Sequence, residues 1–373
     1  MSIFKKYSFL KMFARLLPVN KNSIYFENFR GKGIGDDPRY IAEELHRRNP
    51  KYRLYWLVED KNIKLPDYFT PVERNTFRMH CALSKSAVWV SNVKNSFKPV
   101  KKKNQFYVQC WHSTLNFKNN EGAAKSLNED YIMASKYDAS ITDLMYSDNE
   151  LRYNHFKTNF FYSGEVKKCD VPRIQAVVKR TDEFKTKIRE EYGIAENKKI
   201  AVYMPTFRKA KTVDVYDTDF DAVADALGKR FGSEFVVLMK LHPTMSHLSF
   251  EKFENAVDVT SHTDPFELIA AADVVISDYS GIIFESIVAR KPLFLIAKDI
   301  KEYISGDRGF MVDIEKMPVK FCESDEELYS CIENFNEEEY CKKCLDFESY
   351  VGFSDSFNGA EQIADIIEEF LKK

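Results

Sequence analysis

Short β-type runs alternate with helical stretches along most of this chain, and this alternation restricts its fold more than any other feature. It runs from Ser23 to Trp111 and returns from Lys199 to Ile296. A strand, a helix and a second strand in succession form a parallel pair joined by a crossover helix. The sequence therefore predicts an α/β protein with two Rossmann-like, doubly wound domains facing each other across a cleft.

The β-type runs and helical stretches also set the expected boundaries. In the first half, β-type runs cover Ile24–Phe26, Arg53–Val58, Ala87–Ser91, Gln105–Trp111, Ala139–Thr142 and Asn159–Ser163, and helices cover Pro38–Arg48 and Phe77–Lys85. In the second half, strands at Lys199–Met204, Glu234–Leu241, Asp273–Ser277 and Pro292–Ile296 alternate with helices at Asp219–Phe231, Pro265–Ala271 and Gly281–Arg290. We expect an amphipathic helix in residues 1–20, domains at 21–170 and 171–350, and a C-terminal helix in 351–373.

Composition narrows the class of protein. A chain of 373 residues with 44% hydrophobic content has enough material for two cores. The formal net charge of −2 gives no case for a nucleic-acid partner. The seven cysteines are irregularly spaced, and Cys341-x-x-Cys344 has no second pair of matching spacing. These observations favour reduced thiols in a cytosolic protein and predict no metal site.

The segment Met1–Leu17 is basic and amphipathic. It carries Phe4, Phe9, Leu10, Phe13, Leu16 and Leu17 among Lys5, Lys6, Lys11 and Arg15. Lys11 and Arg15 interrupt the apolar stretch, which argues against a signal peptide or a spanning helix. Two interpretations stay open, a helix lying on an anionic membrane surface and a helix packed on the protein's own body.

Asp273–Ser277 reads as a buried strand that runs into a small-residue turn and then a helix. Ser280 and Gly281 fall at the expected helix start, where free backbone N–H groups and the helix dipole favour a phosphate. Glu285 lies one turn further on, within reach of a ribose hydroxyl. The alternative is a plain strand-to-helix junction capped by Ser280.

Three other strands end in residues suited to phosphate or proton chemistry. His112 follows Gln105–Val108, and a neutral imidazole there can accept a proton from a hydroxyl. His242, followed by Pro243, can donate to a leaving phosphate. Arg208 offers a planar fork for phosphate oxygens. Structural hydrogen bonds for the histidines and a solvated charge run for Arg208 are the alternatives.

A glycine-rich loop opens the first domain between Asn28 and Asp37. Its spacing fits neither the P-loop nor the G-x-G-x-x-G pattern. We expect a flexible loop that ends with Asp37 as the helix N-cap and Pro38 at the first helical position. Arg30 or Lys32 can contact a phosphate of an acceptor molecule.

Taken together in this order, these segments resemble the CDP-glycerol glycerophosphotransferases, which build teichoic acids and related phosphate-linked polymers. The resemblance rests on Phe26-Glu27-Asn28-Phe29-x-Gly31-Lys32 with Asp37-Pro38, Trp111-His112-Ser113-Thr114, Met204-Pro205-Thr206-Phe207-Arg208, Lys240-Leu241-His242-Pro243, Ser277-Asp278-Tyr279-Ser280-Gly281 with Glu285, and Arg308-Gly309-Phe310. It implies a GT-B fold and peripheral attachment to the cytoplasmic face of the cell membrane. It also implies transfer of glycerol phosphate from CDP-glycerol to a lipid-linked saccharide or a growing teichoic-acid-like or capsular polymer, with release of CMP and no cofactor beyond that donor.

The resemblance also implies residue roles. His112 matches a general base for the acceptor hydroxyl, and His242 matches a histidine at the donor pyrophosphate. The other residues that we expect to bind substrate are Arg208, Thr206, Lys240, Asp278, Ser280, Gly281, Glu285, Arg308, Lys32 and Thr114.

The sequence departs from the family pattern in two places. In the first, Ser113 stands where the family usually has glycine, and Leu115–Asn116–Phe117 replace the stretch that usually follows. In the second, Gly281 stands where serine is common. A side chain at Ser113 disfavours positive φ beside the expected base. Ribitol phosphate as the moved group stays open, as do a GT-B nucleotide-sugar glycosyltransferase or epimerase and a catalytically dead membrane adaptor. The acceptor's identity and the oligomeric state are not set by the sequence.

Overall fold

The protein forms two compact units in the computed structural model, which describes residues 14–60, 62–95, 99–115, 117–124, 127–206, 208, 217–241, 253–306 and 309–373. The first unit comprises the described residues of 1–112, 126–175 and 355–373. The second comprises those of 113–125 and 176–354. The expected boundary near residue 170 therefore lies close to a division at 175. The segment 113–125, however, belongs to the second unit, and the C-terminal segment belongs to the first.

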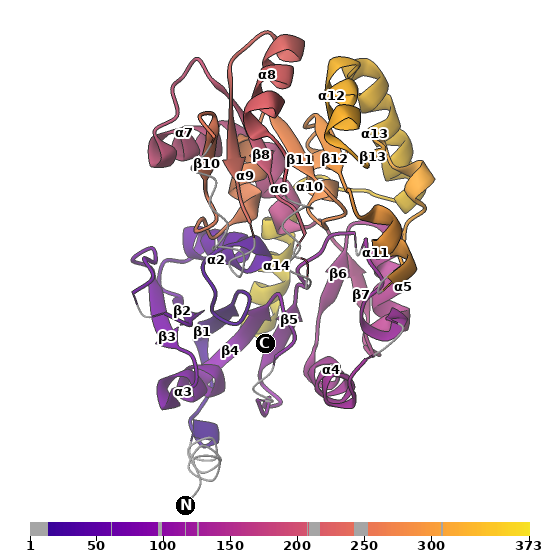
Figure 1. The fold of residues 1–373 in the computed structure, drawn as a ribbon. Coiled ribbons are helices and arrows are strands. Elements are labelled where there is room, and N and C mark those ends of the chain that lie inside the picture. Colours follow the sequence, from indigo (N-terminus) through magenta and orange to yellow (C-terminus); the bar gives the residue numbers. More distant parts are fainter. Residues whose placement is uncertain are drawn as a thin grey trace, which may run out of the picture. The chain divides into compact units, whose positions relative to one another are not determined.

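The first unit contains a five-stranded parallel sheet in the order β3-β2-β1-β4-β5 (Figure 1). Its strands are β1 (Asn20–Glu27), β2 (Arg53–Val58), β3 (Phe69–Glu73), β4 (Ser86–Ser91) and β5 (Phe106–Gln109), and its crossover helices are α2 (Asp36–Arg48) and α3 (Phe77–Lys85). Both faces of β4 are buried, as expected of a strand covered by helices on both sides. Tyr25, Trp89 and Tyr107 pack with Met79 and Leu83 of α3 in one core cluster.

A second group of elements completes the first unit. It consists of α4 (Glu129–Ile141), β6 (Met145–Ser147), α5 (Glu150–Asn159) and β7 (Val166–Lys168), with β6 and β7 paired in parallel. The strands predicted at Ala139–Thr142 and Asn159–Ser163 are wrong, because the first run ends α4 and the second begins at the last residue of α5. The side chains of Asn128 and Asn149 cap these helices by accepting from backbone N–H groups. Helix α4 then continues to Ile141, and α5 ends at Asn159.

The second unit contains a six-stranded parallel sheet in the order β10-β9-β8-β11-β12-β13. Its strands are β8 (Lys199–Tyr203), β9 (Phe235–Met239), β10 (Ala256–Asp258), β11 (Val274–Ser277), β12 (Leu293–Ile296) and β13 (Phe321–Cys322). Its helices are α7 (Thr181–Tyr192), α8 (Phe220–Phe231), α9 (Pro265–Ala271), α10 (Ile283–Val288), α11 (Ile300–Gly306), α12 (Asp325–Glu333) and α13 (Glu337–Val351), with 3₁₀ turns at Glu121–Ala123 and Ile314–Lys316. Helix α6 (Pro172–Lys179) contains the division between the units.

Both sheets are doubly wound, and each has one topological switch point. In the first sheet the chain begins at β1, moves out to β3 and returns to place β4 on the other side of β1. In the second sheet β8 and β11 are the corresponding neighbours. Ligands of such sheets bind beyond the carboxyl ends of the strands at this point. The loops after β1, β4, β8 and β11 are therefore the places to examine for function.

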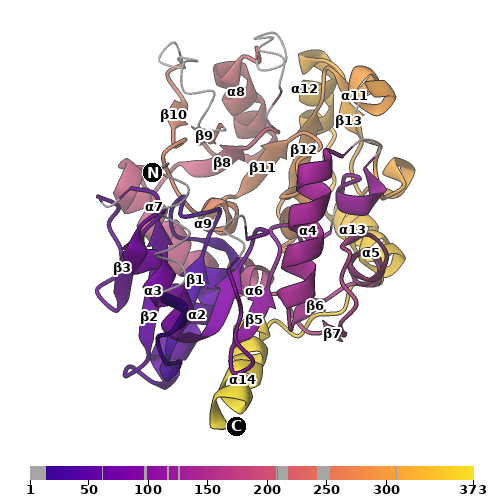
Figure 2. The same cartoon turned by 90° about the horizontal axis from the view of Figure 1, so that it is seen from below.

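The C-terminal helix α14 (Gly359–Lys372) packs on α2 of the first unit (Figure 2). Arg48 Nη1 lies 2.5 Å from Asp365 and 3.1 Å from Glu368, both on α14. A Cβ atom at Gly359 would lie 2.7 Å from the carbonyl oxygen of Asp170, so the helix starts where only glycine fits. Throughout the described ranges, no helix combines the length and the apolar character that crossing a bilayer requires. Residues 1–13 of the expected amphipathic helix lie outside these ranges.

A buried carboxyl group at the end of β1 makes stability depend on pH. Glu27 is 1% exposed, and neither carboxyl oxygen has a hydrogen-bond partner within the described residues. Burial, with a smaller effect of Asp138, raises the pKa of Glu27 from 4.5 to about 8. Between these values the folded chain holds a proton that the unfolded chain has lost, so the stability of the fold decreases as pH rises from 4.5 to 8.

We predict that Glu27→Gln removes most of this decrease, because the amide is neutral throughout. Urea unfolding at pH 5 and pH 8 measures the effect, and the variant should exceed the wild type by several kcal/mol at pH 8 only. Glu73→Gln, at an exposed carboxylate that ends β3, is the matched control and should keep the wild-type slope. Equal slopes for Glu27→Gln and the wild type would contradict the assignment.

Candidate functional site

Asn92, which follows β4, holds the glycine-rich loop at the first switch point. Its side-chain oxygen accepts from the Phe29 N–H at 2.8 Å, and its amide nitrogen donates to Asn28 and to Asp36 at 2.7 Å each. Gly31 has φ of 94°, and a Cβ atom there would lie 2.8 Å from the backbone nitrogen of Glu59. The loop expected to be flexible is therefore fixed at both ends. Lys32 is exposed on it.

The guanidinium of Arg173 closes this loop from α6. Arg173 is fully buried and pairs with Asp36, while its Nη2 lies 3.4 Å from Asp37. Tyr146 also donates to Asp37 at 2.7 Å. Burial raises the pKa of Asp37 to about 6 against the opposing charge of Arg173. The expectation that Asp37 caps α2 is wrong: the helix begins at Asp36, and the Asp37 carboxylate instead accepts from the Arg173 N–H at 2.9 Å and from Tyr146.

His112 lies exposed beyond the end of β5, where contacts with neighbouring residues orient its ring. Its Nδ1 lies 3.0 Å from the carbonyl oxygen of Asn92, and its ring centroid lies 5.4 Å from that of Phe29. A carbonyl oxygen can only accept, so Nδ1 carries the proton and Nε2 carries the lone pair of the neutral ring. This tautomer suits a general base. The preceding Trp111, with φ of 56° and its carbonyl 3.2 Å from Arg173 Nη2, fixes the turn that presents the ring.

At the second switch point Asp278 connects the loop after β8 to the end of β11. Its carboxylate accepts from the N–H and the hydroxyl of Thr206 at 2.8 Å each, and it pairs with Arg208. Arg208 also makes a two-pronged contact with Asp299, at 2.8 and 2.9 Å. Burial alone would lower the pKa of Arg208, but Asp299 and Asp278 raise it above its usual value. Its charge is therefore shared with two carboxylates before any ligand arrives.

The segment that follows His112 lies along the strand ends of the second unit. Thr114 donates to Glu285 at 2.7 Å, and both side chains are buried. This bond uses one oxygen, Oε1, of the carboxylate that was expected to face ribose. A Cβ atom at Gly281 would lie 3.6 Å from the Ser113 hydroxyl, so two of the positions that depart from the family pattern are neighbours. Ser113 is not among the residues with positive φ, which removes the strain expected there.

Lys118 is a candidate binding residue that the sequence analysis missed. Its Nζ donates to the Thr206 hydroxyl at 3.1 Å and lies 5.0 Å from the ring centroid of Tyr279. It also lies 5.4 Å from the ring centroid of Tyr303, which stacks on Tyr279 at 3.8 Å. The sequence analysis did not single out Lys118, because it follows residues 115–117, which differ from the family pattern. A lysine in such a position is usually interpreted as a surface residue. The structure adds it to the cluster of Thr206, Arg208 and Asp278.

The structure gives less support to the other residues that were expected to bind substrate. Lys240 donates to the carbonyls of Thr260 and His262 at 3.3 and 2.6 Å, and burial lowers its pKa, so it holds two loop residues. Ser280 and Gly281 are partly buried, and the predicted helix start is wrong, since α10 begins at Ile283 and is only six residues long. His242 and Arg308 lie outside the described residues. No three His, Cys, Asp or Glu side chains in the described ranges gather as metal ligands would.

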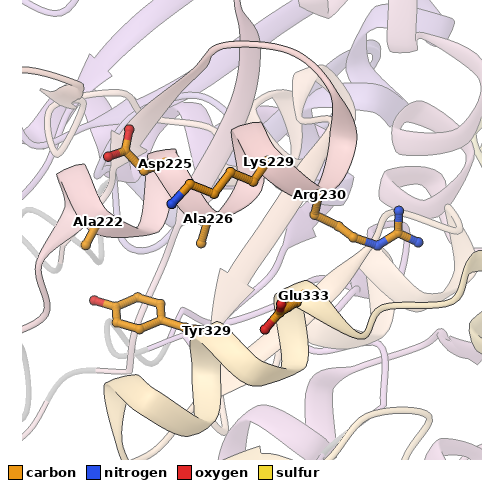
Figure 3. A pocket seen from close by; sticks show the side chains of 7 residues that line it. All are labelled: Ala222, Asp225, Ala226, Lys229, Arg230, Tyr329 and Glu333. Carbon is orange, nitrogen blue, oxygen red and sulfur yellow. The ribbon is translucent and has the colours of Figure 1, made fainter.

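A hollow of about 660 Å³ lies away from these residues, between α8 and α12 (Figure 3). Its walls carry both charge signs, and its lining residues are Ala222, Asp225, Ala226, Lys229, Arg230, Tyr329 and Glu333. None of them follows the carboxyl end of a strand. Each unit therefore carries its own group of candidate residues at its switch point, and the hollow of the second unit is separate from the group in that unit.

We predict that Arg173→Met lowers the free energy of unfolding by about 3–5 kcal/mol, because it leaves two buried carboxylates without their cation. Chemical denaturation measures the loss. The matched control is Arg180→Met, which removes a partly exposed pair with Glu183 and should cost less than about 1 kcal/mol. If Arg173→Met lowered the free energy of unfolding no more than Arg180→Met does, Arg173 would not be needed to stabilise the two buried carboxylates.

Comparison with known proteins identifies the family and the fold. A family model described as CDP-glycerol:poly(glycerophosphate) glycerophosphotransferase matches residues 9–369. A teichoic acid poly(glycerol phosphate) polymerase of Staphylococcus epidermidis is 29% identical over 95% of this chain, which spans only 52% of that relative. A Bacillus spizizenii protein of the same name is 27% identical over 94% of this chain and 93% of its own length.

A solved structure of the wall teichoic acid polymerase TagF matches the whole architecture. It is 26% identical, covers 99% of this chain and 95% of its own, and has a TM-score of 0.88. This match confirms the predicted GT-B fold class. Because the family model covers nearly the entire sequence, the chain belongs to the CDP-glycerol:poly(glycerophosphate) glycerophosphotransferase family.

Proposed function

We propose that this protein transfers glycerol phosphate from CDP-glycerol to a hydroxyl of a lipid-linked saccharide or of a growing teichoic-acid-type polymer, and releases CMP. The orientation of His112 by the Asn92 carbonyl is the observation that carries the proposal, since it leaves the lone pair on Nε2. Family membership and the names of the relatives support the reaction type. A TagF variant soaked with CDPG supports the donor.

The proposed chemistry is a single phosphoryl transfer. His112 Nε2 accepts the proton of the acceptor hydroxyl as its oxygen attacks the phosphorus that bears glycerol. A new oxygen–phosphorus bond forms, and the bond between that phosphorus and the oxygen bridging to CMP breaks. CMP leaves with that oxygen and its negative charge. His242, at a position that the structure does not describe, remains the candidate to donate to this leaving phosphate.

Charge stabilisation of the diphosphate is assigned to the second unit. Arg208 already pairs with Asp278 and Asp299, so we assign it to holding the loop and to shared contact with the phosphates. Lys118 reaches the same loop through a neutral hydroxyl, and we propose that it provides the additional cation. Ser280, Gly281 and Thr206 supply hydroxyl and backbone groups. We propose that Thr114 and Glu285 hold the segment 113–118 in place through their mutual bond.

We further propose that the protein works at the cytoplasmic face of the cell membrane as a peripheral protein. The acceptor would be lipid-linked, and an anionic surface would attract the basic segment Met1–Leu17. The chain spans about half of the Staphylococcus epidermidis relative, so the number of units that it adds is not carried over from that protein.

The direct test measures CMP release by the purified chain. CDP-glycerol and CDP-ribitol are each offered with a panel of lipid-linked saccharide acceptors. We expect acceptor-dependent CMP from CDP-glycerol, and a loss of about 10²–10⁴-fold in His112→Ala. His46→Ala is the matched control: His46 stacks on Tyr68 from α2, and its loss should leave the rate within about twofold.

Each other outcome is informative. Turnover of CDP-ribitol alone would mean that the donor is CDP-ribitol and not CDP-glycerol. CMP release that is unchanged in His112→Ala would remove the base assignment and favour a different nucleophile activator. No CMP from either donor, together with no binding of CDP-glycerol, would overturn the proposed function.

Ser113 and Gly281 give a second prediction. The geometry leaves room for a side chain at residue 281, and φ there is not in the left-handed region. If the Ser113 hydroxyl contacts the donor diphosphate, Ser113→Gly should lower kcat/KM about tenfold. Ser113→Gly combined with Gly281→Ser should return it to within about threefold of the wild type, because the hydroxyl is supplied from the neighbouring position. A double variant as slow as the single one would contradict an interchangeable hydroxyl.

A further inference from the structure

A basic groove of about 380 Å³ lies on the first unit, at the opposite end of the sheet from His112. It is lined by Arg53, Tyr55, Thr70, Arg78, Cys81, Ala82 and Lys85. Arg53 and Thr70 stand at or near the amino ends of β2 and β3. Arg78, Cys81, Ala82 and Lys85 follow the spacing of three and four residues that places side chains on one helix face. The groove thus lies between that face of α3 and the beginnings of β2 and β3. Figure 1 shows the place of these three elements in the first unit.

The groove concentrates positive charge. Arg53, Arg78 and Lys85 are exposed, and none of the three forms an ion pair with a carboxylate anywhere in the described ranges. No lining residue is acidic. Arg48 of the same unit, by contrast, pairs with Glu44 and Asp365. Two guanidinium forks and an ammonium, beside the hydroxyls of Tyr55 and Thr70, are the groups that bind phosphate oxygens.

Residues 14–17, the described part of the basic amphipathic segment, precede β1, whose amino end lies beside this groove. In the sheet, Asn20 of β1 pairs with Ser86, the residue after Lys85, and Ser23 of β1 pairs with Arg53. The amino end of β1 therefore runs between Arg53 of β2 and Ser86 of β4, which directly follows Lys85 of α3. Neighbouring strands lie about 4.8 Å apart.

Contacts of Lys102 place the end of that segment at the groove's rim. Lys102 Nζ donates to the carbonyl and hydroxyl of Ser84, at 2.9 and 2.8 Å, and to the carbonyl of Leu17 at 2.5 Å. Leu16 is 78% exposed at this point. An apolar side chain in water next to three unneutralised cations is the combination that binds anionic lipid.

We propose that this groove binds the phosphate headgroup of an anionic phospholipid. The inference deepens the membrane attachment proposed above and is independent of which polyol phosphate is transferred. The headgroup phosphate contacts Arg53, Arg78 and Lys85, while the exposed Leu16 side chain contacts the acyl region. The groove gives the attachment a specific headgroup site in addition to general attraction to a negative surface.

The test compares vesicle binding of full-length variants. One variant carries Arg53→Gln, Arg78→Gln and Lys85→Gln, and the matched control carries Lys316→Gln, Lys320→Gln and Lys342→Gln, which removes the same charge from exposed positions of the second unit. Co-sedimentation uses vesicles of mixed phosphatidylglycerol and phosphatidylcholine and vesicles of phosphatidylcholine alone. We expect the groove variant to lose roughly tenfold to a hundredfold in affinity for the mixed vesicles, and the control to lose less than about threefold.

The other outcomes of this experiment distinguish the groove site from the proposed membrane attachment and from the proposed reaction. Equal losses in both variants would mean attraction by net charge and would overturn the groove site. A groove variant that loses binding of inorganic phosphate but keeps vesicle binding would reassign the groove to a soluble anion. A wild-type chain without any preference for phosphatidylglycerol would overturn the attachment itself. CMP release with a detergent-solubilised acceptor should be unchanged in the groove variant, which shows that the fold and the catalytic proposal stand separately.

Discussion

The buried guanidinium of Arg173 is the constraint on which the first unit depends. Removing a guanidinium and two carboxylates from water costs several kcal/mol per ion, so the arrangement persists only because every partner is held in place. Arg173 satisfies Asp36 and Asp37 at the start of α2 and reaches the carbonyl of Trp111. One side chain therefore fixes both the glycine-rich loop and the turn that presents His112. The orientation of the imidazole follows from this burial.

In the second unit a buried arginine also pairs with two aspartates, but these lie on separate loops. Arg208 lies between Asp278 and Asp299, and Asp278 also accepts from the N–H and the hydroxyl of Thr206. Burial alone would raise the pKa of Asp299, but the hydrogen bonds and charge of Arg208 lower it, so this carboxylate is ionised at neutral pH. In both units an arginine between two aspartates stabilises the loops at the switch point, where the strand order itself leaves an opening.

Much of this architecture was predictable from the sequence. The strand at Arg53–Val58 and the helices at Phe77–Lys85 and Pro265–Ala271 match the structure in their bounds, because apolar periodicity and Pro or Thr at the starts mark them clearly. Strand β10 and strand β13 were missed because two or three residues carry no measurable period.

The candidate site was predicted less completely, for a physical reason. Sequence patterns report which residues follow a strand, but not which other segment packs against them. The segment 113–125 belongs to the second unit although it follows a strand of the first, and only this placement reveals Lys118 beside Thr206 and Ser113 beside Gly281. Asp278 and Glu285 were predicted as ligand contacts, yet their oxygens accept from Thr206, Arg208 and Thr114. Sequence patterns alone do not distinguish a carboxylate that stabilises a loop from one that binds a ligand.

The charges at the second switch point explain why Lys118 matters. Arg208 and Lys118 carry two positive charges, and Asp278 and Asp299 carry two negative ones, so this cluster is neutral as a whole. A diphosphate entering it finds no net attraction and must bind through oriented groups, namely the Lys118 ammonium, the hydroxyls and the backbone N–H groups. Lys118 contacts the Thr206 hydroxyl and the rings of Tyr279 and Tyr303, which are uncharged groups. Arg208 cannot move without breaking its ion pair with Asp278. In the proposed reaction Lys118 is therefore assigned to the leaving phosphate, and Arg208 is assigned to stabilising the loop.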